Sequence, residues 1–198
     1  MTCLVCLKKM IRAPRAKTCS NACREKLHRY GPTKKAHVSH ATGHKEWYTP
    51  ERFTDAAREV MGEIDLDPAS SAAANEIVKA VRFYTEGDDG LSQPWAGRVW
   101  MNPPYAQPFI TQFCQRVAAF YRSGEVSEAV VLVNNASETR FFQALDSEAD
   151  AVCFPKGRIK FWYPDKPSFT PLQGQAIFYL GPHSDRYREV FGQFGRCR

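Results

Sequence analysis

The sequence predicts an α/β fold, in which a doubly wound sheet carries helices on both faces and a small cysteine-rich module precedes it. Three observations lead to this prediction. Segments with helical apolar spacing alternate with short apolar segments typical of strands. One such strand, residues 129–133, is apolar at every position, as expected within a parallel sheet. Four of the seven cysteines fall within the first 23 residues of the 198-residue chain, which is long enough for one domain with an appendage.

The main domain is expected to begin with a helix at Thr49-Pro50, where the threonine side chain can cap the helix and proline suits the first turn. Its apolar face has helical spacing and consists of Phe53, Ala56, Ala57 and Val60. Further helices are predicted at 72–81, 108–122 and 138–145, and strands at 63–67, 98–101, 129–133, 151–154, 159–163 and 176–180. In such a sheet, ligands bind beyond the carboxyl ends of the strands.

Charge divides the chain unevenly. Residues 1–46 hold eleven Lys and Arg against two Glu, whereas residues 47–198 hold sixteen Lys and Arg against nineteen acidic residues. We therefore predict a cysteine module at 1–30, a basic linker at 31–46 and the main domain at 47–198. A basic segment on a mildly acidic domain favours a polyanion such as nucleic acid as partner, and a solvated tail is the alternative.

The cysteine module has the spacing Cys3-x2-Cys6-x12-Cys19-x3-Cys23, which is typical of two chelating pairs. Four thiolates suit tetrahedral zinc, and a closed site of this kind is structural rather than catalytic. The module resembles a treble-clef-like zinc knuckle. Its basic surroundings are compatible with a grip on phosphate, and a role in folding alone remains the alternative.

The clearest chemical motif is Asn102-Pro103-Pro104-Tyr105, directly after the strand at 98–101. Neither proline has an N–H group, so the turn presents acceptors. The Asn102 side-chain oxygen and the Pro103 carbonyl can accept both hydrogens of an exocyclic amine and stabilise the positive charge that develops as the nitrogen attacks a methylsulfonium. Tyr105 can stack on the base, which would have to flip out of a duplex. The motif predicts amine methylation, and a simple proline-rich turn is the alternative.

The motif has companions that make a wider pattern: Trp47-Tyr48-Thr49-Pro50, Asp67-Pro68-Ala69-Ser70, Asp88-Asp89-Gly90-Leu91, Trp95 and Gly157-Arg158-Ile159-Lys160-Phe161. Together they resemble the phage DNA N-6-adenine methyltransferase (Dam-like) family over roughly residues 47–180. The resemblance implies a Rossmann-like sheet that binds S-adenosylmethionine and transfers its methyl group to adenine N6 of double-stranded DNA. It also implies a phage or prophage origin and action in the cytoplasm of a bacterial host, with a monomer assumed.

By that resemblance, Trp47, Thr49, Asp67, Pro68, Ser70, Asp89 and Leu91 bind the cofactor. Asp67 would attract its amino and sulfonium groups, Asp89 would accept from its adenine, and Leu91 would cover the ring. The chain lacks the glycine-rich loop common in methyltransferases, but small residues after Asp67 still permit close approach. Asp88 competes with Asp89 for its role. Ordinary turns at Asp67-Pro68 and Asp89-Gly90 are the alternatives.

The segment 156–173 mixes basic and aromatic residues, and we expect Arg158 and Lys160 to bind DNA, with hairpin packing as an equal alternative for the segment. No apolar run approaches a membrane span, and the N-terminus lacks a signal-peptide pattern, so neither a membrane partner nor secretion is expected. Related chemistry on cytosine N4, RNA or a protein glutamine remains open, as does a non-catalytic zinc-dependent DNA-binding protein.

Overall fold

The structure is a computed structural model, and it describes residues 20, 22, 48–163, 166–169 and 173–198. By its contacts the chain divides into two units, Met1–Thr42 and Gly43–Arg198. The described residues belong almost entirely to the second unit. Apart from residues 20 and 22, the predicted cysteine module and the linker lie outside them.

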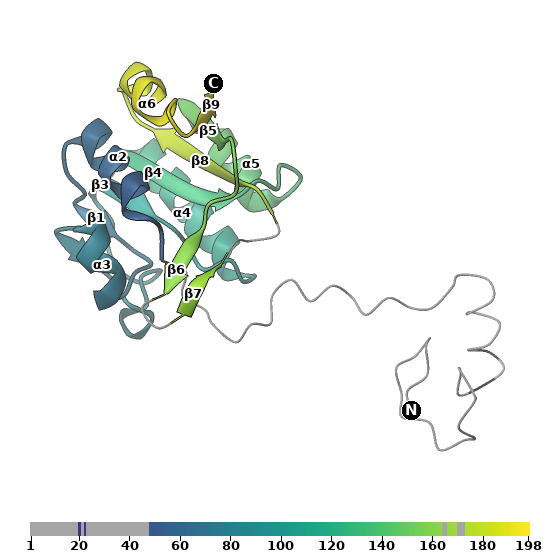
Figure 1. The fold of residues 1–198 in the computed structure, drawn as a ribbon. Helices are drawn as coiled ribbons and strands as arrows, with labels where there is room; N and C mark the ends of the chain where they lie inside the picture. Colours follow the sequence, from purple (N-terminus) through teal and green to yellow (C-terminus); the bar gives the residue numbers. More distant parts are fainter. Residues whose placement is uncertain (1–19, 21, 23–47, 164–165, 170–172) are drawn as a thin grey trace. The chain divides into compact units, whose positions relative to one another are not determined.

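The described part of the second unit contains a mixed sheet of seven strands in the order β2-β1-β3-β4-β8-β5-β9 (Figure 1). Its strands are β1 (Leu66–Asp67), β2 (Arg82–Phe83), β3 (Gly97–Met101), β4 (Val126–Asn134), β5 (Ala151–Pro155), β8 (Gln175–Leu180) and β9 (Gly195–Cys197). The first four strands in this order are parallel to one another. β8 is antiparallel to both β4 and β5, and β9 is antiparallel to β5.

The parallel part of the sheet has a topological switch point, where successive connections lead to opposite sides of the sheet. From β1 the chain passes through α3 (Ala72–Val78) to β2 on one side, whereas from β3 it passes through α4 (Phe109–Ser123) to β4 on the other. β1 and β3 are neighbours, so the switch lies between them. In open α/β sheets this is where ligands bind, beyond the carboxyl ends of the strands.

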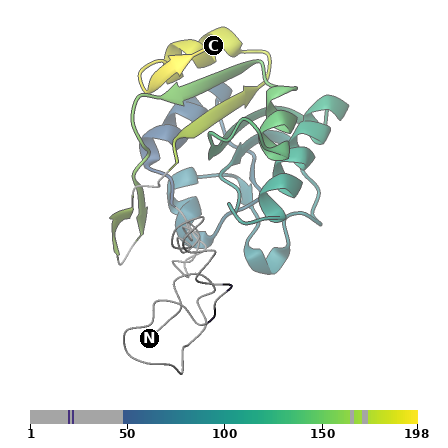
Figure 2. The same cartoon turned by 90° about the vertical axis from the view of Figure 1, so that its right-hand side faces the viewer.

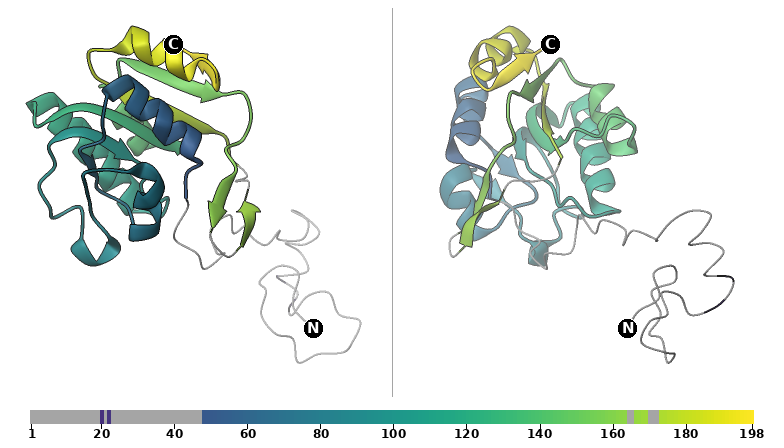
Figure 3. Two further views of the ribbon diagram at one scale, coloured as in Figure 1. Left: turned by 60° about the vertical axis from the view of Figure 1, so that its left-hand side comes forward. Right: turned by 45° about the vertical axis from the view of Figure 1, so that its right-hand side comes forward.

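Helices cover both faces of the sheet, as the sequence predicts (Figure 3). α2 (Glu51–Met61) and α6 (Ser184–Phe191) pack on one face, where Trp100, Val130 and Leu132 point toward them. α4 and α5 (Arg140–Asp146) pack on the other, against Val99, Met101 and Val131. The alternation along β3 and β4 follows from the period of two in a strand, and it divides the core into two layers. No helix among the described residues is long and apolar enough to cross a membrane.

The predicted helices at 72–81, 108–122 and 138–145 are present with shifted ends. α3 stops at Val78 because Lys79 adopts a left-handed conformation (φ 55°), so Val81 is not helical. The prediction that Thr49 caps the first helix is wrong. Pro50 is the extended residue before α2, and no side chain caps its N-terminus.

Two of the predicted strands also need correction. Only Leu66 and Asp67 of the strand predicted at 63–67 are in the sheet. The strand predicted at 159–163 shortens to β6 (Phe161–Tyr163) and pairs with β7 (Lys166–Phe169) in a separate two-stranded ribbon (Figure 2). The sequence reasoning missed β2, β7, α6, β9 and the short helix η1 (Glu86–Asp88).

Candidate functional site

Two sequence-predicted segments meet at the switch point of the sheet. Asp67 is the last residue of β1, and Asn102 directly follows β3. The two strands are parallel neighbours, with Leu66 paired to Val99, so their carboxyl ends lie at the same edge. This edge therefore contains the predicted cofactor loop and the predicted catalytic turn together.

Asp67 is a buried carboxylate with little compensation. Its side chain belongs to a residue only 3% exposed, and the Ala69 N–H donates to its Oδ1 at 3.2 Å. No Lys, Arg or His of the described residues forms an ion pair with it. Burial raises the pKa of Asp67 to about 7, because removal from water disfavours the charged form. The site thus holds an acidic group that a cationic ligand would stabilise as a carboxylate.

Ser70 contributes a second unsatisfied group beside Asp67. Its Oγ is buried, and its hydroxyl lies near enough to the Asp67 carboxyl to favour the charged form, yet it makes no hydrogen bond of normal geometry within the described residues. Its backbone N–H donates to the Tyr84 carbonyl at 2.8 Å, which fixes the loop. A buried polar atom without a partner is uncommon and indicates a place for a ligand or water.

The second predicted cofactor segment packs directly against the first. A Cβ atom on Gly90 would lie 2.0 Å from the Pro68 carbonyl oxygen, so only glycine permits this approach. The Trp95 Nε1–H donates to the Gly90 carbonyl at 2.7 Å and holds the segment in place. Leu91 is half-buried and packs against the core layer beneath α4. The structure therefore joins the segments around Asp67 and Asp89 into one surface.

The alternatives Asp88 and Asp89 differ in what their side chains contact. Asp88 Oδ2 accepts from the Thr85 N–H at 2.8 Å and from the Thr85 hydroxyl at 2.7 Å, and these bonds lower the pKa of Asp88. Asp89 is exposed in a left-handed conformation (φ 50°) and makes no side-chain hydrogen bond to the described residues. Asp88 is committed to its local turn, which favours Asp89 for a contact with a ligand.

Arg116 is a supporting residue that the sequence reasoning missed. It donates from Nη2 to the Gln93 carbonyl at 2.7 Å, and its guanidinium lies 5.4 Å from the centre of the Trp95 ring. It also lies 4.6 Å from the centre of the Phe120 ring. Arg116 therefore ties the loop that carries Gly90 to α4. In the sequence, Arg116 lies three residues after Phe113 and four before Phe120 on a predicted helix. This position does not indicate a contact with the loop that carries Gly90.

The predicted catalytic turn is internally bonded. The Tyr105 hydroxyl donates to the Asn102 side-chain oxygen at 3.0 Å. Tyr105 is half-buried against the core layer beneath α4, and burial raises its pKa well above the usual range, so it stays a donor. Pro103 is buried and Pro104 half-buried. In this conformation Tyr105 orients the Asn102 amide, a role that the sequence reasoning did not give it.

The segment before α2 lies against both the ribbon and the predicted cofactor loop. The Tyr48 and Trp162 rings are 5.1 Å apart, and the Trp162 N–H donates to the Tyr48 carbonyl at 3.1 Å. The Ser71 hydroxyl donates to the Tyr48 hydroxyl at 3.4 Å, next to the cofactor loop. Thr49 is buried in this segment. Trp47, also predicted to bind cofactor, lies outside the described residues.

The predicted DNA-binding residues Arg158 and Lys160 are both exposed, and they flank Ile159, which is buried. Phe161 is buried in the core layer beneath α2, and Trp162 packs on Tyr48. The apolar members of this segment therefore have a packing role, whereas the two basic side chains face solvent. Their contact with DNA stays a prediction.

The predicted zinc ligands Cys3, Cys6, Cys19 and Cys23 lie outside the described residues. Within the part of the chain that the structure describes, no group of His, Cys, Asp or Glu side chains is arranged to hold a metal ion. The described cysteines, Cys114, Cys153 and Cys197, are free thiols.

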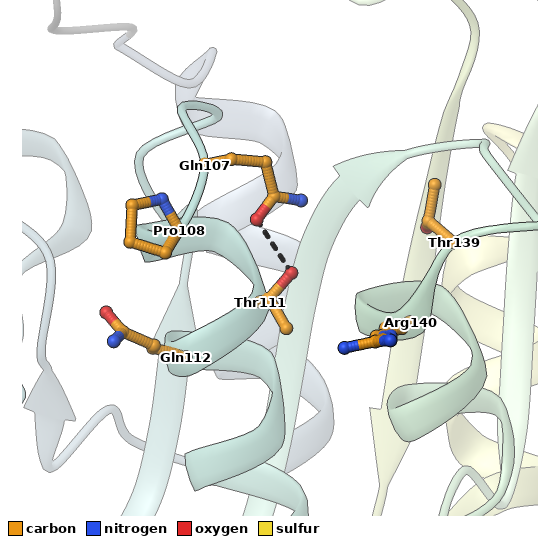
Figure 4. A pocket seen from close by; sticks show the side chains of 6 residues that line it. All are labelled: Gln107, Pro108, Thr111, Gln112, Thr139 and Arg140. Atoms are coloured by element: carbon orange, nitrogen blue, oxygen red, sulfur yellow. Dashed lines mark hydrogen bonds between the residues drawn. The ribbon is translucent and has the colours of Figure 1, made fainter.

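A groove that begins two residues after the predicted catalytic turn in the chain was not predicted. It has a volume of about 450 Å³ and lies between the first turns of α4 and α5 (Figure 4). We call it the α4–α5 groove, and it is lined by Gln107, Pro108, Thr111, Gln112, Thr139 and Arg140. On the α4 side of the groove, the Thr111 hydroxyl donates to Gln107 Oε1 at 2.9 Å.

Comparison with models of known protein families identifies a match. The sequence model of the family described as DNA N-6-adenine-methyltransferase (Dam) matches residues 36–180, which cover most of the chain and both segments of the site. A search of curated proteins returns no match.

Proposed function

The chain belongs to the DNA N-6-adenine-methyltransferase (Dam) family, and on this premise we propose that it transfers a methyl group from S-adenosylmethionine to adenine N6 in double-stranded DNA. The observation that carries the proposal is the meeting of two features at one sheet edge. A buried carboxylate, Asp67, has no cationic partner among the described residues, and an acceptor-rich turn at Asn102 follows the neighbouring strand.

The residues present fit the proposed cofactor. S-adenosylmethionine is cationic at its sulfur and supplies an electrophilic methyl group. The Asp67 carboxyl would hold a cationic group, and the buried Ser70 hydroxyl still has hydrogen-bonding capacity. The close approach of Gly90 to Pro68 leaves two backbone segments side by side, with Asp89 and Leu91 next to them. Acidic, hydroxyl and apolar groups on one surface suit a ligand with an amino acid end and a purine end.

The chain's own contribution to the chemistry is to hold and polarise the amine. An amide oxygen can accept two hydrogen bonds, so acceptance from Tyr105 at 3.0 Å is compatible with a second bond from an N–H group. The Asn102 oxygen and the Pro103 carbonyl then stabilise positive charge on the nitrogen as it gains a methyl group and before it gives up a proton. Because the turn is fixed by Tyr105 and two prolines, little reorganisation is needed during the reaction.

The position of the turn at the edge of the sheet determines how an adenine base can reach it. An adenine stacked in a duplex cannot bring N6 against a side chain at the edge of a sheet, so we propose that the base flips out of the helix. The exposed Arg158 and Lys160 on the segment before β6 would contact the DNA backbone.

The spacing of the four N-terminal cysteines supports a structural zinc site formed by Cys3, Cys6, Cys19 and Cys23. Elemental analysis of the full chain should then find one zinc per molecule, and substitution of Cys19 by Ser should lower that ratio. A full-length protein without bound metal would refute the ligand set. We also propose a phage or prophage origin and action in a bacterial cytoplasm, which rest on the resemblance of the motifs alone.

The proposed activity is tested by incubating the protein with S-adenosylmethionine carrying a labelled methyl group and with unmethylated duplex DNA. The protein should be expressed in a host without DNA methyltransferases, and Asn102→Ala prepared in parallel serves as the blank. The DNA is then digested to nucleosides. We expect label in N6-methyladenine. Label in N4-methylcytosine would mean that the target base is cytosine. Label found only in RNA or protein controls would overturn the proposal.

A further inference from the structure

The α4–α5 groove lies close along the chain to the catalytic turn, and the proposed activity does not use it. We infer that this groove binds the DNA strand beside the target base, with Arg140 on a phosphate and Phe109 against an unstacked base. This inference rests on the proposed function, because it takes DNA as the occupant.

The position of the groove limits what can cover it. Gln107 follows Asn102 by five residues, and five residues span at most about 18 Å. One DNA strand advances about 3.4 Å per nucleotide, so this distance corresponds to about five nucleotides. A strand whose base reaches Asn102 therefore has its neighbouring nucleotides within reach of the groove.

Arg140 supplies the charge. It is exposed at the start of α5, and Figure 4 shows its side chain at the groove between α5 and α4. It makes no ion pair or hydrogen bond from its guanidinium within the described part of the chain, although the exposed Glu138 is two residues away. Arg186 and Arg188 on α6, by contrast, are paired with carboxylates. A guanidinium that has no partner among the described residues, and that shares a groove with Gln107, suits a phosphate.

Phe109 supplies an apolar surface. It directly follows Pro108 of the groove and is 49% exposed. Phe109 and Val81 are the two strongly exposed large hydrophobic side chains of the described residues, and of these only Phe109 lies next in the chain to a residue that lines the groove. Base-to-aromatic stacking is tolerant of sequence and strong enough to hold a nucleotide that has lost its neighbour.

The polar residues of the groove match base edges. The Gln107 amide is held by the Thr111 hydroxyl, and the exposed Gln112 lies one turn into α4. Glutamine amides can donate to and accept from a base edge at the same time. The groove thus combines a cation with amides, and the exposed ring of Phe109 follows its lining residue Pro108 in the chain. Charge, amides and a nearby aromatic ring are the groups expected for nucleic acid rather than for an apolar ligand.

The charge part of the inference is tested by fluorescence anisotropy with a labelled random-sequence 20-bp duplex at a series of salt concentrations. Arg140→Gln should reduce the slope of log affinity against log salt by about 0.9, because one phosphate contact is lost. Arg186→Gln removes the same charge on α6 and should leave the slope unchanged. Equal slopes for wild type and Arg140→Gln, or equal losses in both variants, would overturn the phosphate contact.

The stacking part is tested with a single-stranded 20-mer. Phe109→Ala should bind it at least about fivefold more weakly, with the salt slope unchanged because no charge is lost. Val81→Ala is the matched control and should bind like the wild type. Unaltered affinity in Phe109→Ala would overturn the stacking. Both tests measure binding without methyl transfer, so a protein that binds as expected but labels no DNA would refute the proposed activity and leave this inference standing.

Discussion

The buried carboxylates at the two ends of the sheet differ in how many partners compensate their charge. At the carboxyl end, Asp67 is 3% exposed and has one backbone N–H for a partner, with an unsatisfied Ser70 hydroxyl beside it. Near the start of β4, Glu128 is 7% exposed, accepts from the Tyr179 hydroxyl at 2.7 Å and lies 3.3 Å from His183 Nδ1. The pKa of Asp67 is raised to about 7 by burial, a sign that its environment does not support the charge.

A second charged group at the start of the strands is compensated as well. Arg98 at the beginning of β3 pairs with Asp65 at 2.8 Å and with Glu63 at 2.9 Å. The hydrogen bonds from Arg98 lower the pKa of Asp65. The comparison teaches that burial alone does not identify a site in this protein. What distinguishes the carboxyl end is a set of buried groups whose partners are missing from the described residues, and such groups are costly unless a ligand pairs them.

The largest effect is expected at the proposed catalytic turn. Asn102→Ala should lower the rate of methyl transfer by at least 100-fold, because it removes an acceptor that stabilises charge in the transition state. Thermal unfolding should stay close to that of the wild type, since Asn102 is half-buried at a loop. Gln115→Ala, which removes an exposed amide from α4, is the control. Retained transfer in Asn102→Ala would remove the basis of the proposed mechanism.

The next largest effect concerns pH. Asp67 is mostly neutral below pH 7 and ionised above it, so binding of cationic S-adenosylmethionine should tighten about tenfold from pH 6 to pH 8. Calorimetric titration over this range measures it. Asp67→Asn should bind more weakly at pH 8 and lose the dependence on pH. A pH-dependent affinity that persists in Asp67→Asn would assign the titration to another group.

The raised pKa of Asp67 affects the stability of the fold in the opposite direction from cofactor binding. A carboxyl whose pKa is higher in the folded than in the unfolded protein binds its proton more tightly when folded, so stability falls as the pH rises from about 4 to 7. Asp67→Asn should therefore unfold at a temperature equal to or above that of the wild type at pH 8. A lower unfolding temperature would mean that the carboxylate has a structural partner after all.

At the amino end of the strands, a substitution is expected to lower stability and leave methyl transfer unchanged. Tyr179→Phe should lower the free energy of unfolding by about 1–3 kcal/mol, because the buried Glu128 loses its hydroxyl donor. Methyl transfer measured below the unfolding transition should be unchanged. Tyr121→Phe, whose hydroxyl bonds the Asp150 carboxylate at 2.8 Å nearer the surface, should cost less. If Tyr179→Phe impairs transfer without a loss of stability, the contrast between the two ends fails.

The smallest effect is expected at the loop support. Trp95→Phe keeps an aromatic ring but removes the fused pyrrole ring with the N–H that donates to the Gly90 carbonyl at 2.7 Å. Loss of that hydrogen bond by itself is worth about 1 kcal/mol. We expect the dissociation constant for S-adenosylmethionine to rise by about threefold to fivefold as Gly90 shifts from Pro68. An unchanged constant together with a lower stability would show that the bond supports only the fold.

The sequence predicted the central elements well because their patterns are strong. Residues 129–133 are apolar throughout and form the interior of β4, and the helical spacing of Phe53, Ala56, Ala57 and Val60 gives the buried face of α2. α6 contains the same kind of signal in Tyr187, Val190 and Phe191, but it is short and rich in charge. β2 has two residues and β9 three, too few for a period to be recognised.

The direction of a strand is the property that residue patterns did not reveal. β8 is buried at all six positions, as a parallel strand would be, yet it is antiparallel to both its neighbours. For the site, the motifs located Asp67 and Asn102 at strand ends. They could not show that Gly90 touches Pro68 or that Tyr105 bonds Asn102, because these contacts depend on how the loops fold onto one another.

The position of β8 in the sheet determines when the sheet can be completed during synthesis of the chain. β8 lies between β4 and β5, and both precede it in the chain. Until residues 175–180 have been made, one edge of β4 and both edges of β5 lack their final partners. Apolar strands with open edges pair readily with other chains. A nascent or truncated chain that ends before residue 175 is therefore expected to aggregate, although it contains both segments of the site.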